Sequence, residues 1–305
     1  MNPRTVLHVG ALIVAVIFPR SIVSQSSTTP IILQLPPTVR TAGFNGAGVA
    51  LIGDAGSVFI NPAGMATIRR MAVEGSYRSI GQGTYLATGA MAWRIGQFDV
   101  GLGGRYFDRG SAPGPFPLAP APAGEPTYQA LGVGSLIYRF GLIAIGGSGK
   151  YYRQRVGDVY DRAVSIDAGI ALAFFDIAAL AFSTQNIGGN WVDSTGVTLG
   201  RVSRLGFTMN YVDPLETWRL MSTWEVQWVE GQSARGVLGV EAGVVISGVG
   251  ILGRAGYAGR TAPYSDAKVT GGATLTLGRF LLDYAYRPDD LTGKDAHIVG
   301  LRLTF

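Results

Sequence analysis

The sequence has no cysteine and little charge: 15% of its 305 residues are charged, against about 25% in ordinary soluble domains. The absence of cysteine excludes a disulfide scaffold and a cysteine-ligated metal site. Because 47% of the residues are hydrophobic, the chain does not have the polar composition of a disordered protein. The basic residues are scattered without a dense block, and this excludes a nucleic-acid partner.

Long apolar runs are also missing beyond the N-terminus. The nearest candidate, residues 169–182, is interrupted by Asp176 and is shorter than the roughly 20 residues that a membrane-spanning helix needs. The short run Val9 to Phe18 follows a basic start and precedes small polar residues, which predicts a secretory signal peptide over residues 1–24. A helical membrane protein is therefore excluded, and a sheet remains.

Alternating strands account for most of the remaining chain, over residues 71–305. Phe98, Leu102 and Tyr106 share one face of a strand, whereas Asp99 and Arg105 lie on the other. This pattern recurs, and it predicts fourteen strands near residues 72–79, 84–93, 98–109, 127–140, 142–154, 163–174, 178–186, 201–211, 219–229, 234–246, 248–258, 268–277, 279–287 and 298–305.

An even number of strands with apolar outward faces predicts an all-β fold, a transmembrane antiparallel β-barrel of the bacterial outer membrane. Outer-membrane lipid would cover its apolar face. A soluble β-sandwich would also alternate, but its outward face would carry more charge. The 45 glycines, about 15% of the chain, show no triplet period and so do not indicate collagen.

The connections alternate in expected length, which predicts which barrel end faces the periplasm. Short turns are expected around Gly96, Gly141, Asp176, Gly248 and Gly278, and these belong to the periplasmic end. The connections over residues 110–126, 155–162, 186–200 and 289–296 are expected to be longer, external loops.

The C-terminal residues also have a pattern typical of outer-membrane barrels. Gly300, Leu303 and Phe305 make a Gly-x-x-apolar-x-aromatic ending. This ending resembles the signal that the outer-membrane barrel-assembly machinery reads, so that machinery is an expected partner.

Residues 25–70 do not alternate and form an N-terminal extension. This extension contains a Gly/Ala-rich stretch and an Asn-Pro-Ala-Gly turn, with the marked residues Gly46, Gly48, Asp54, Asn61, Pro62, Ala63 and Gly64. It resembles the N-terminal region of PorV/PorQ proteins and their larger FadL-type relatives. The resemblance extends to Gln185–Gly188, Glu241, Arg254–Tyr257 and Asp283–Tyr286. It implies that the extension forms a small hatch of helices and turns in the periplasmic mouth of the barrel.

Motifs for catalysis or cofactors fail their context tests. Gly248 to Gly253 forms a GxGxxG, but a strand follows it instead of a helix, so a hairpin turn is expected. His297 has acids nearby but no nucleophile at a recognisable spacing, and a surface histidine is the preferred interpretation. The loop acids match no calcium-loop pattern. The chain is therefore expected to be no enzyme and to bind no cofactor or metal.

Two functions are compatible with such a barrel. The PorV/PorQ resemblance implies a plugged barrel that docks a secretion translocon or cargo proteins, as in type IX secretion, with Pro115, Phe116 and Pro117 as a candidate partner loop. The alternative is a FadL-like passive channel for hydrophobic small molecules such as long-chain fatty acids. The inward positions Arg105, Arg204, Arg219 and Glu225 would line a greasy tunnel poorly, which favours the docking barrel.

Overall fold

The computed structural model describes residues 29–305 except 82, 110–126, 175–176, 190–196, 198, 213–216, 260–266 and 291–293. The expected signal peptide and the candidate partner loop around Phe116 lie outside the described residues. Within the described part, no helix has the length and apolar character needed to cross a membrane.

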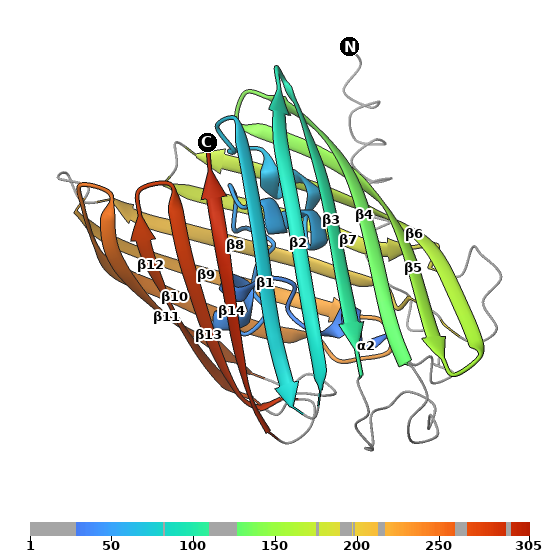
Figure 1. Ribbon diagram of the computed structural model, residues 1–305. Helices are drawn as coiled ribbons and strands as arrows, with labels where there is room; N and C mark the ends of the chain where they lie inside the picture. Colours follow the sequence, from blue (N-terminus) through green and yellow to red (C-terminus); the bar gives the residue numbers. More distant parts are fainter. Residues whose placement is uncertain are drawn as a thin grey trace, which may run out of the picture.

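Fourteen antiparallel strands form one closed barrel, as the alternation predicted (Figure 1). The strands are β1 (Met71–Gly81), β2 (Thr84–Ile95), β3 (Phe98–Asp108), β4 (Thr127–Phe140), β5 (Ile143–Val156), β6 (Val159–Phe174), β7 (Ala178–Ile187), β8 (Val202–Val212), β9 (Trp218–Val229), β10 (Arg235–Ile246), β11 (Val249–Ala258), β12 (Val269–Leu277), β13 (Phe280–Asp290) and β14 (Lys294–Thr304). Each strand pairs with its neighbours in sequence, and β14 pairs with β1, with Ala72 opposite Thr304. Closure leaves no open edge, the condition that a bilayer imposes on a sheet.

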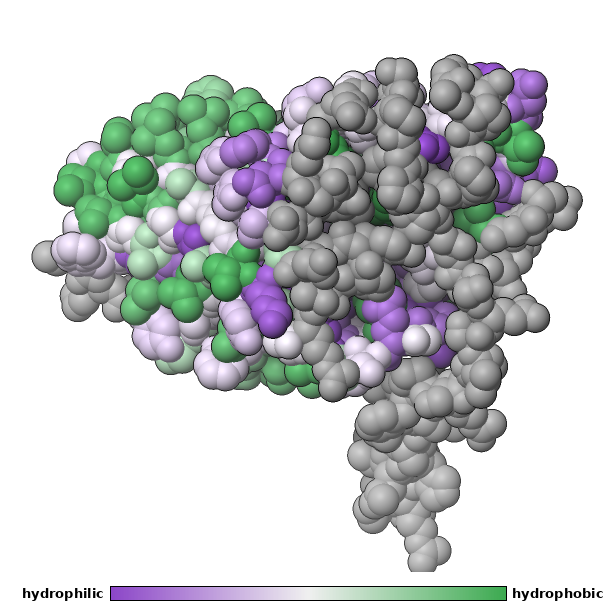
Figure 2. Space-filling view, turned by 90° about the horizontal axis from the view of Figure 1, so that it is seen from below, coloured by the Kyte–Doolittle hydropathy of each residue, from purple (hydrophilic) through white to green (hydrophobic). Residues whose placement is uncertain are grey.

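The two faces of the barrel wall differ as predicted. On β3, Phe98 and Leu102 point outward and are 46% and 54% exposed, whereas Asp99 and Arg105 point inward and are buried. Figure 2, which looks at the end opposite the C-terminus, shows hydrophobic side chains on the flank of the barrel. The wall is therefore that of a barrel of the outer-membrane type, with lipid on its apolar side.

The start of β1 and the end of β14 meet at one end of the barrel, called here the turn end; the other is the loop end. Tight turns such as those at Gly96 and Gly141 close hairpins at the turn end, as predicted.

Two external connections are shorter than the sequence indicated. β5 and β6 continue until Val156 pairs with Val159, so residues 155–162 hold only a tight turn, in which Gly157 adopts φ 58°. β13 and β14 likewise extend until Asp290 pairs with Lys294, so most of the expected loop over 289–296 is strand. In both hairpins the backbone pairing between the strands continues past the residues that the apolar alternation had assigned to strands.

The N-terminal segment, residues 29–70, lies inside the barrel (Figure 1). It contains two short α-helices, α2 (Ile31–Gln34) and α3 (Val39–Gly43), and two 3₁₀ helices, η1 (Ala55–Phe59) and η2 (Pro62–Met65). Inside the lumen, the segment is not confined to one mouth of the barrel. The backbone N–H of Ile32 donates to Gln129 near the loop end, while η2 packs on β5 and β6 in the half nearer the turn end.

Candidate functional site

Local capping shapes the N-terminal segment. Thr38 and Thr41 form a reciprocal capping box at the start of α3. The side chain of Asn61 accepts from the backbone N–H of Ala63, which starts η2, and its amide donates to the carbonyl of Val49 at 2.9 Å. Asn61 therefore ties two separate parts of the segment together.

Glycines on the inner wall make room for this segment. A Cβ on Gly103 would lie 2.6 Å from the ring of Phe59, and a Cβ on Gly239 would lie 2.6 Å from the ring of Phe44. The inward glycines that the segment contacts in this way are Gly101, Gly103, Gly146, Gly169, Gly206, Gly239, Gly256 and Gly300. Eight of the 45 glycines thus form a surface complementary to the segment.

Glu225 on β9 anchors the middle of the segment. One carboxylate oxygen accepts hydrogen bonds from the backbone N–H groups of Gly48 and Val49, at 2.6 and 2.8 Å. The other oxygen accepts from Arg204 and Gln227, both at 2.8 Å. The carboxylate is almost fully buried, so these donors replace the water that it loses on folding.

A closed ring of six charges joins the segment to the wall. It alternates three arginines with three carboxylates, at N–O distances between 2.6 and 3.1 Å: Arg40, Asp54, Arg302, Asp283, Arg254 and Glu241. Burial alone would raise the pKa of Asp54, but the guanidinium groups of Arg40 and Arg302 outweigh burial and hold this pKa below its usual value. Asp54 therefore stays ionised at neutral pH.

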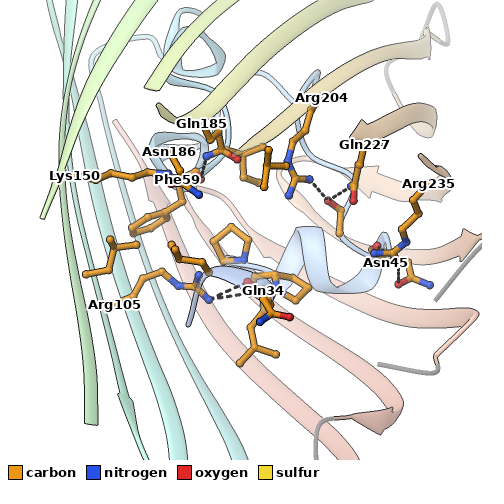
Figure 3. Close-up of a pocket in the computed structure, with 18 of the residues that line it drawn as sticks. Gln34, Asn45, Phe59, Arg105, Lys150, Gln185, Asn186, Arg204, Gln227 and Arg235 are labelled. Carbon is orange, nitrogen blue, oxygen red and sulfur yellow. Dashed lines mark hydrogen bonds between the residues drawn. The ribbon is translucent and has the colours of Figure 1, made fainter. Parts of the chain in front are cut away.

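A small cavity remains between the segment and the wall (Figure 3). Its volume is about 70 Å³, roughly half of an engineered apolar cavity that admits benzene. Apolar groups line one part, including Leu33, Leu35, Phe59, Leu131 and Val202. The charged groups that line it are all cationic, namely Arg105, Lys150, Arg204, Arg235 and Arg287.

The wall cations hold the segment as well as lining the cavity. Arg105 donates to the backbone carbonyls of Ile32 and Leu35, and Arg235 donates to the side-chain oxygen of Asn45 at 2.9 Å. Among the described residues that line the cavity there is no carboxylate. Directly behind the lining, Lys150 pairs with Asp167 and Arg204 pairs with Glu225, both at 2.8 Å. The cavity therefore combines apolar surface with cationic groups, two of which have buried carboxylate partners.

Solved structures with this architecture come from outer-membrane transporters. The Ralstonia pickettii toluene transporter TbuX is 12% identical, with a TM-score of 0.56 over 90% of this chain and 99% of its own. A Pseudomonas aeruginosa FadL homologue is 12% identical, with a TM-score of 0.58 over 88% and 98%. The CymD monoaromatic hydrocarbon channel is 10% identical, with a TM-score of 0.55 over 90% and 98%.

The chain has the fold of the FadL-type outer-membrane barrels. No protein-family model matches the sequence, and no curated protein is similar to it by sequence. At such low identity the likeness shows the FadL-type fold alone, and the finer PorV/PorQ resemblance stays a prediction.

The marked residues of the extension lie together inside this FadL-type barrel. Gly46 takes a positive φ of 91°, and a Cβ on Gly48 would lie 2.6 Å from Ile60. Asp54 belongs to the charge ring. Asn61, Pro62, Ala63 and Gly64 form the buried η2 turn and the position before it. The role of these residues as a hatch is a proposal considered below.

The other predicted residues lie elsewhere. Gly300 faces inward against Val39, whereas Phe305 is 45% exposed on the outer face, and its backbone N–H donates to Met71. Arg219, expected inside, is exposed at the turn end. His297 lies on the outer face, where Nδ1 is 2.7 Å from the hydroxyl of Tyr284. Gly248 forms the turn between β10 and β11, as expected.

Sequence reasoning placed Arg105 and Arg204 inside but did not single out Lys150, Arg235 and Arg287 as residues of a site. The alternation of Lys150 with Tyr151 indicates an inward side chain. Alternation could have found all of these cations, since it gives the facing of every strand residue. It could not have shown that they meet the N-terminal segment, which is distant in sequence.

Proposed function

We propose that the protein is a passive channel of the outer membrane for small hydrophobic molecules, and that the N-terminal segment gates it. The observation that carries this proposal is a lumen largely filled by a separate segment that is held by side-chain contacts instead of by strand pairing. The FadL-type fold supports it, since the neighbours named above include transporters of toluene and monoaromatic hydrocarbons. Because the segment fills most of the lumen, it has to move before a solute can pass.

The cavity narrows the chemistry of the transported molecule. Its apolar lining suits a hydrocarbon chain or ring, while lining cations such as Arg105 and Arg235, which donate to oxygens of the segment, suit one negatively charged group. A long-chain carboxylic acid has both features. This mixed lining answers the objection that polar inward residues make a poor tunnel, because an amphiphile requires both surfaces.

A redox lock tests the gating. A Cβ on Gly206 would lie 3.6 Å from the Cβ of Ala50, within the range that a disulfide spans. Since the chain has no cysteine, Ala50→Cys with Gly206→Cys creates a single defined bridge. Val49→Ala makes room, because a Cβ on Gly206 would lie 2.5 Å from Val49 Cγ1. Ala50 lies between α3 and η1, so the bridge restrains both sides of the segment.

The measurement is uptake of a long-chain fatty acid, and separately of toluene, by proteoliposomes with and without reductant. We expect the oxidised variant to be closed and the reduced variant, which is its matched control, to transport. Deletion of residues 38–65 should leave a permanently open pore. Equal uptake by the oxidised and reduced variant would contradict the gating. The absence of uptake by both the reduced variant and the deletion variant would contradict the proposal that the barrel is a channel.

A plugged barrel that docks a secretion translocon or cargo is the second candidate. The small size of the cavity favours it, since a docking barrel needs no wide path through the lumen. Under this function the oxidised and reduced forms should capture the same partner protein equally and show no solute uptake. The hatch function of the N-terminal segment is common to both candidates.

A further inference from the structure

Two arginines face each other on the outside of the barrel, where side chains otherwise contact lipid. Arg153 on β5 lies directly opposite Arg162 on β6, and both are exposed. Residues directly opposite in an antiparallel pair have Cβ atoms about 5 Å apart, and like charges there repel each other. Such a pair is stable when an anion lies between the two side chains.

Neighbouring side chains extend and orient this pair. Arg155 is on the same face of β5, and the guanidinium carbons of Arg153 and Arg155 lie 4.9 and 5.2 Å from the centre of the Tyr160 ring. Cation–π contacts of this kind hold guanidinium groups in place without neutralising them. The patch defined by Arg153, Arg155 and Arg162, with Tyr160 between its members, is therefore preformed.

Carboxylates do not neutralise the patch. Asp158 lies 3.8 Å from Arg155 and is fully exposed in the turn. Asp161 accepts from Gln154, an inward side chain, and so faces the lumen. Among the described residues no carboxylate forms an ion pair with Arg153 or Arg162. Three cations thus share one exposed acid.

The position of the patch along the membrane normal indicates which part of the lipid lies beside it. The β5–β6 hairpin closes at the loop end, at the lower right of Figure 1. The outward residues of β5 are apolar from Ile145, and Tyr151 directly precedes the patch. Eight residues from Ile145 to Arg153 span about 26 Å along the strand, or roughly 20 Å along the membrane normal at a typical tilt. The patch therefore lies at the outer rim of the apolar belt, where lipid headgroups begin.

We propose that Arg153, Arg155 and Arg162 form a binding site for the phosphate groups of a phosphorylated glycolipid in the outer leaflet. Guanidinium groups bind phosphate oxygens in bidentate pairs, and one phosphate between Arg153 and Arg162 removes their repulsion. Tyr151 and Tyr160 contact the adjoining sugar and chain region. The site lies outside the lumen, so it is independent of whether the barrel transports or docks.

The test uses the full-length barrel purified in a neutral detergent and titrated with bis-phosphorylated lipid A, or with the same lipid after its phosphates are removed. We expect the phosphorylated lipid to bind and to raise the melting temperature. The double variant R153Q/R162Q should bind roughly tenfold or more weakly, since each arginine near an anionic lipid contributes about a fivefold gain. R153K/R162K keeps the charge but loses the planar fork, and should be intermediate.

The matched control is R69Q/R70Q, which removes the same charge from two exposed arginines at the turn end. It should bind as the unaltered protein does. Heat-modifiable migration verifies that every variant has folded. The proposal is overturned if R153Q/R162Q binds normally, if the control weakens binding equally, or if the lipid without phosphates binds as well. It is also overturned if the patch binds an acidic peptide but no lipid, since it would then belong to a protein partner.

Discussion

A single carboxylate, Glu225, carries more of the contact between segment and wall than any residue near it in sequence. Alternation along β9 predicts that it points inward, and it does. Its donors Gly48 and Val49 lie 177 and 176 residues away, however. Long-range pairs of this kind depend on how the chain is packed in three dimensions, and a single sequence carries no local signal for them.

Replacing Glu225 by alanine should loosen the segment. The change leaves two buried N–H groups without their acceptor and Arg204 without its carboxylate partner, a loss of about 3–5 kcal/mol for a broken buried pair. Hydrogen exchange of the peptide that contains Gly48 and Val49 should become faster by a hundredfold or more, as this loss implies for local opening. Glu230→Ala is the control, because Glu230 is exposed and its carboxylate accepts from the backbone N–H of Arg201, which lies outside the segment. Unchanged exchange in Glu225→Ala would show that the segment is held elsewhere.

Among the elements, strands were predictable where the bilayer imposes a pattern and less so beyond it. β3 and β9 follow the expected ranges within one residue. β5, β6 and β14 are longer than expected because their pairing continues beyond the stretch in which apolar and polar residues alternate regularly. The short helices of the segment were expected as a small hatch of helices and turns, but without their bounds, since capping residues mark helix starts but do not reveal what covers them.

The fit between strands and segment predicts that one added methyl group is enough to disturb it. On Gly256 of β11, a Cβ would overlap the backbone of Phe44 and Asn45, which cannot yield as a side-chain tip can. Gly256→Ala should therefore destabilise the closed lumen by about 1–3 kcal/mol and lower the melting temperature in detergent. Gly149→Ala, at a position with nothing within 4 Å, should be neutral. Equal melting of the two variants would contradict the close packing described here.

At the scale of the whole molecule, the strand count and closure were predictable because a membrane barrel admits few solutions. Apolar outward faces and an even number of strands leave little besides a closed antiparallel barrel. The contacts inside the lumen could not be predicted from the same constraints. A ring of charges such as Arg40, Asp54 and Arg302 combines residues from both ends of the chain, and it arises only once the barrel has closed around the segment.

Because the barrel is closed by the pairing of β14 with β1, folding depends on the last strand. Without β14, β1 and β13 would each present an unpaired edge to lipid, where an unsatisfied backbone group costs several kcal/mol. Deleting residues 294–305 should therefore abolish heat-modifiable, folded protein. Gln232→Ala in the exposed turn before β10 should leave its amount unchanged.

Phe305→Ala separates assembly from stability. The side chain is 45% exposed, and its backbone hydrogen bond to Met71 does not depend on it. The variant that does fold should therefore melt within a few degrees of the unaltered protein. If Phe305 is read by the barrel-assembly machinery, the amount of folded barrel in the membrane should fall several-fold, while refolding of purified protein into detergent proceeds normally. A normal amount in the membrane would show that the terminal aromatic is not an assembly signal in this chain.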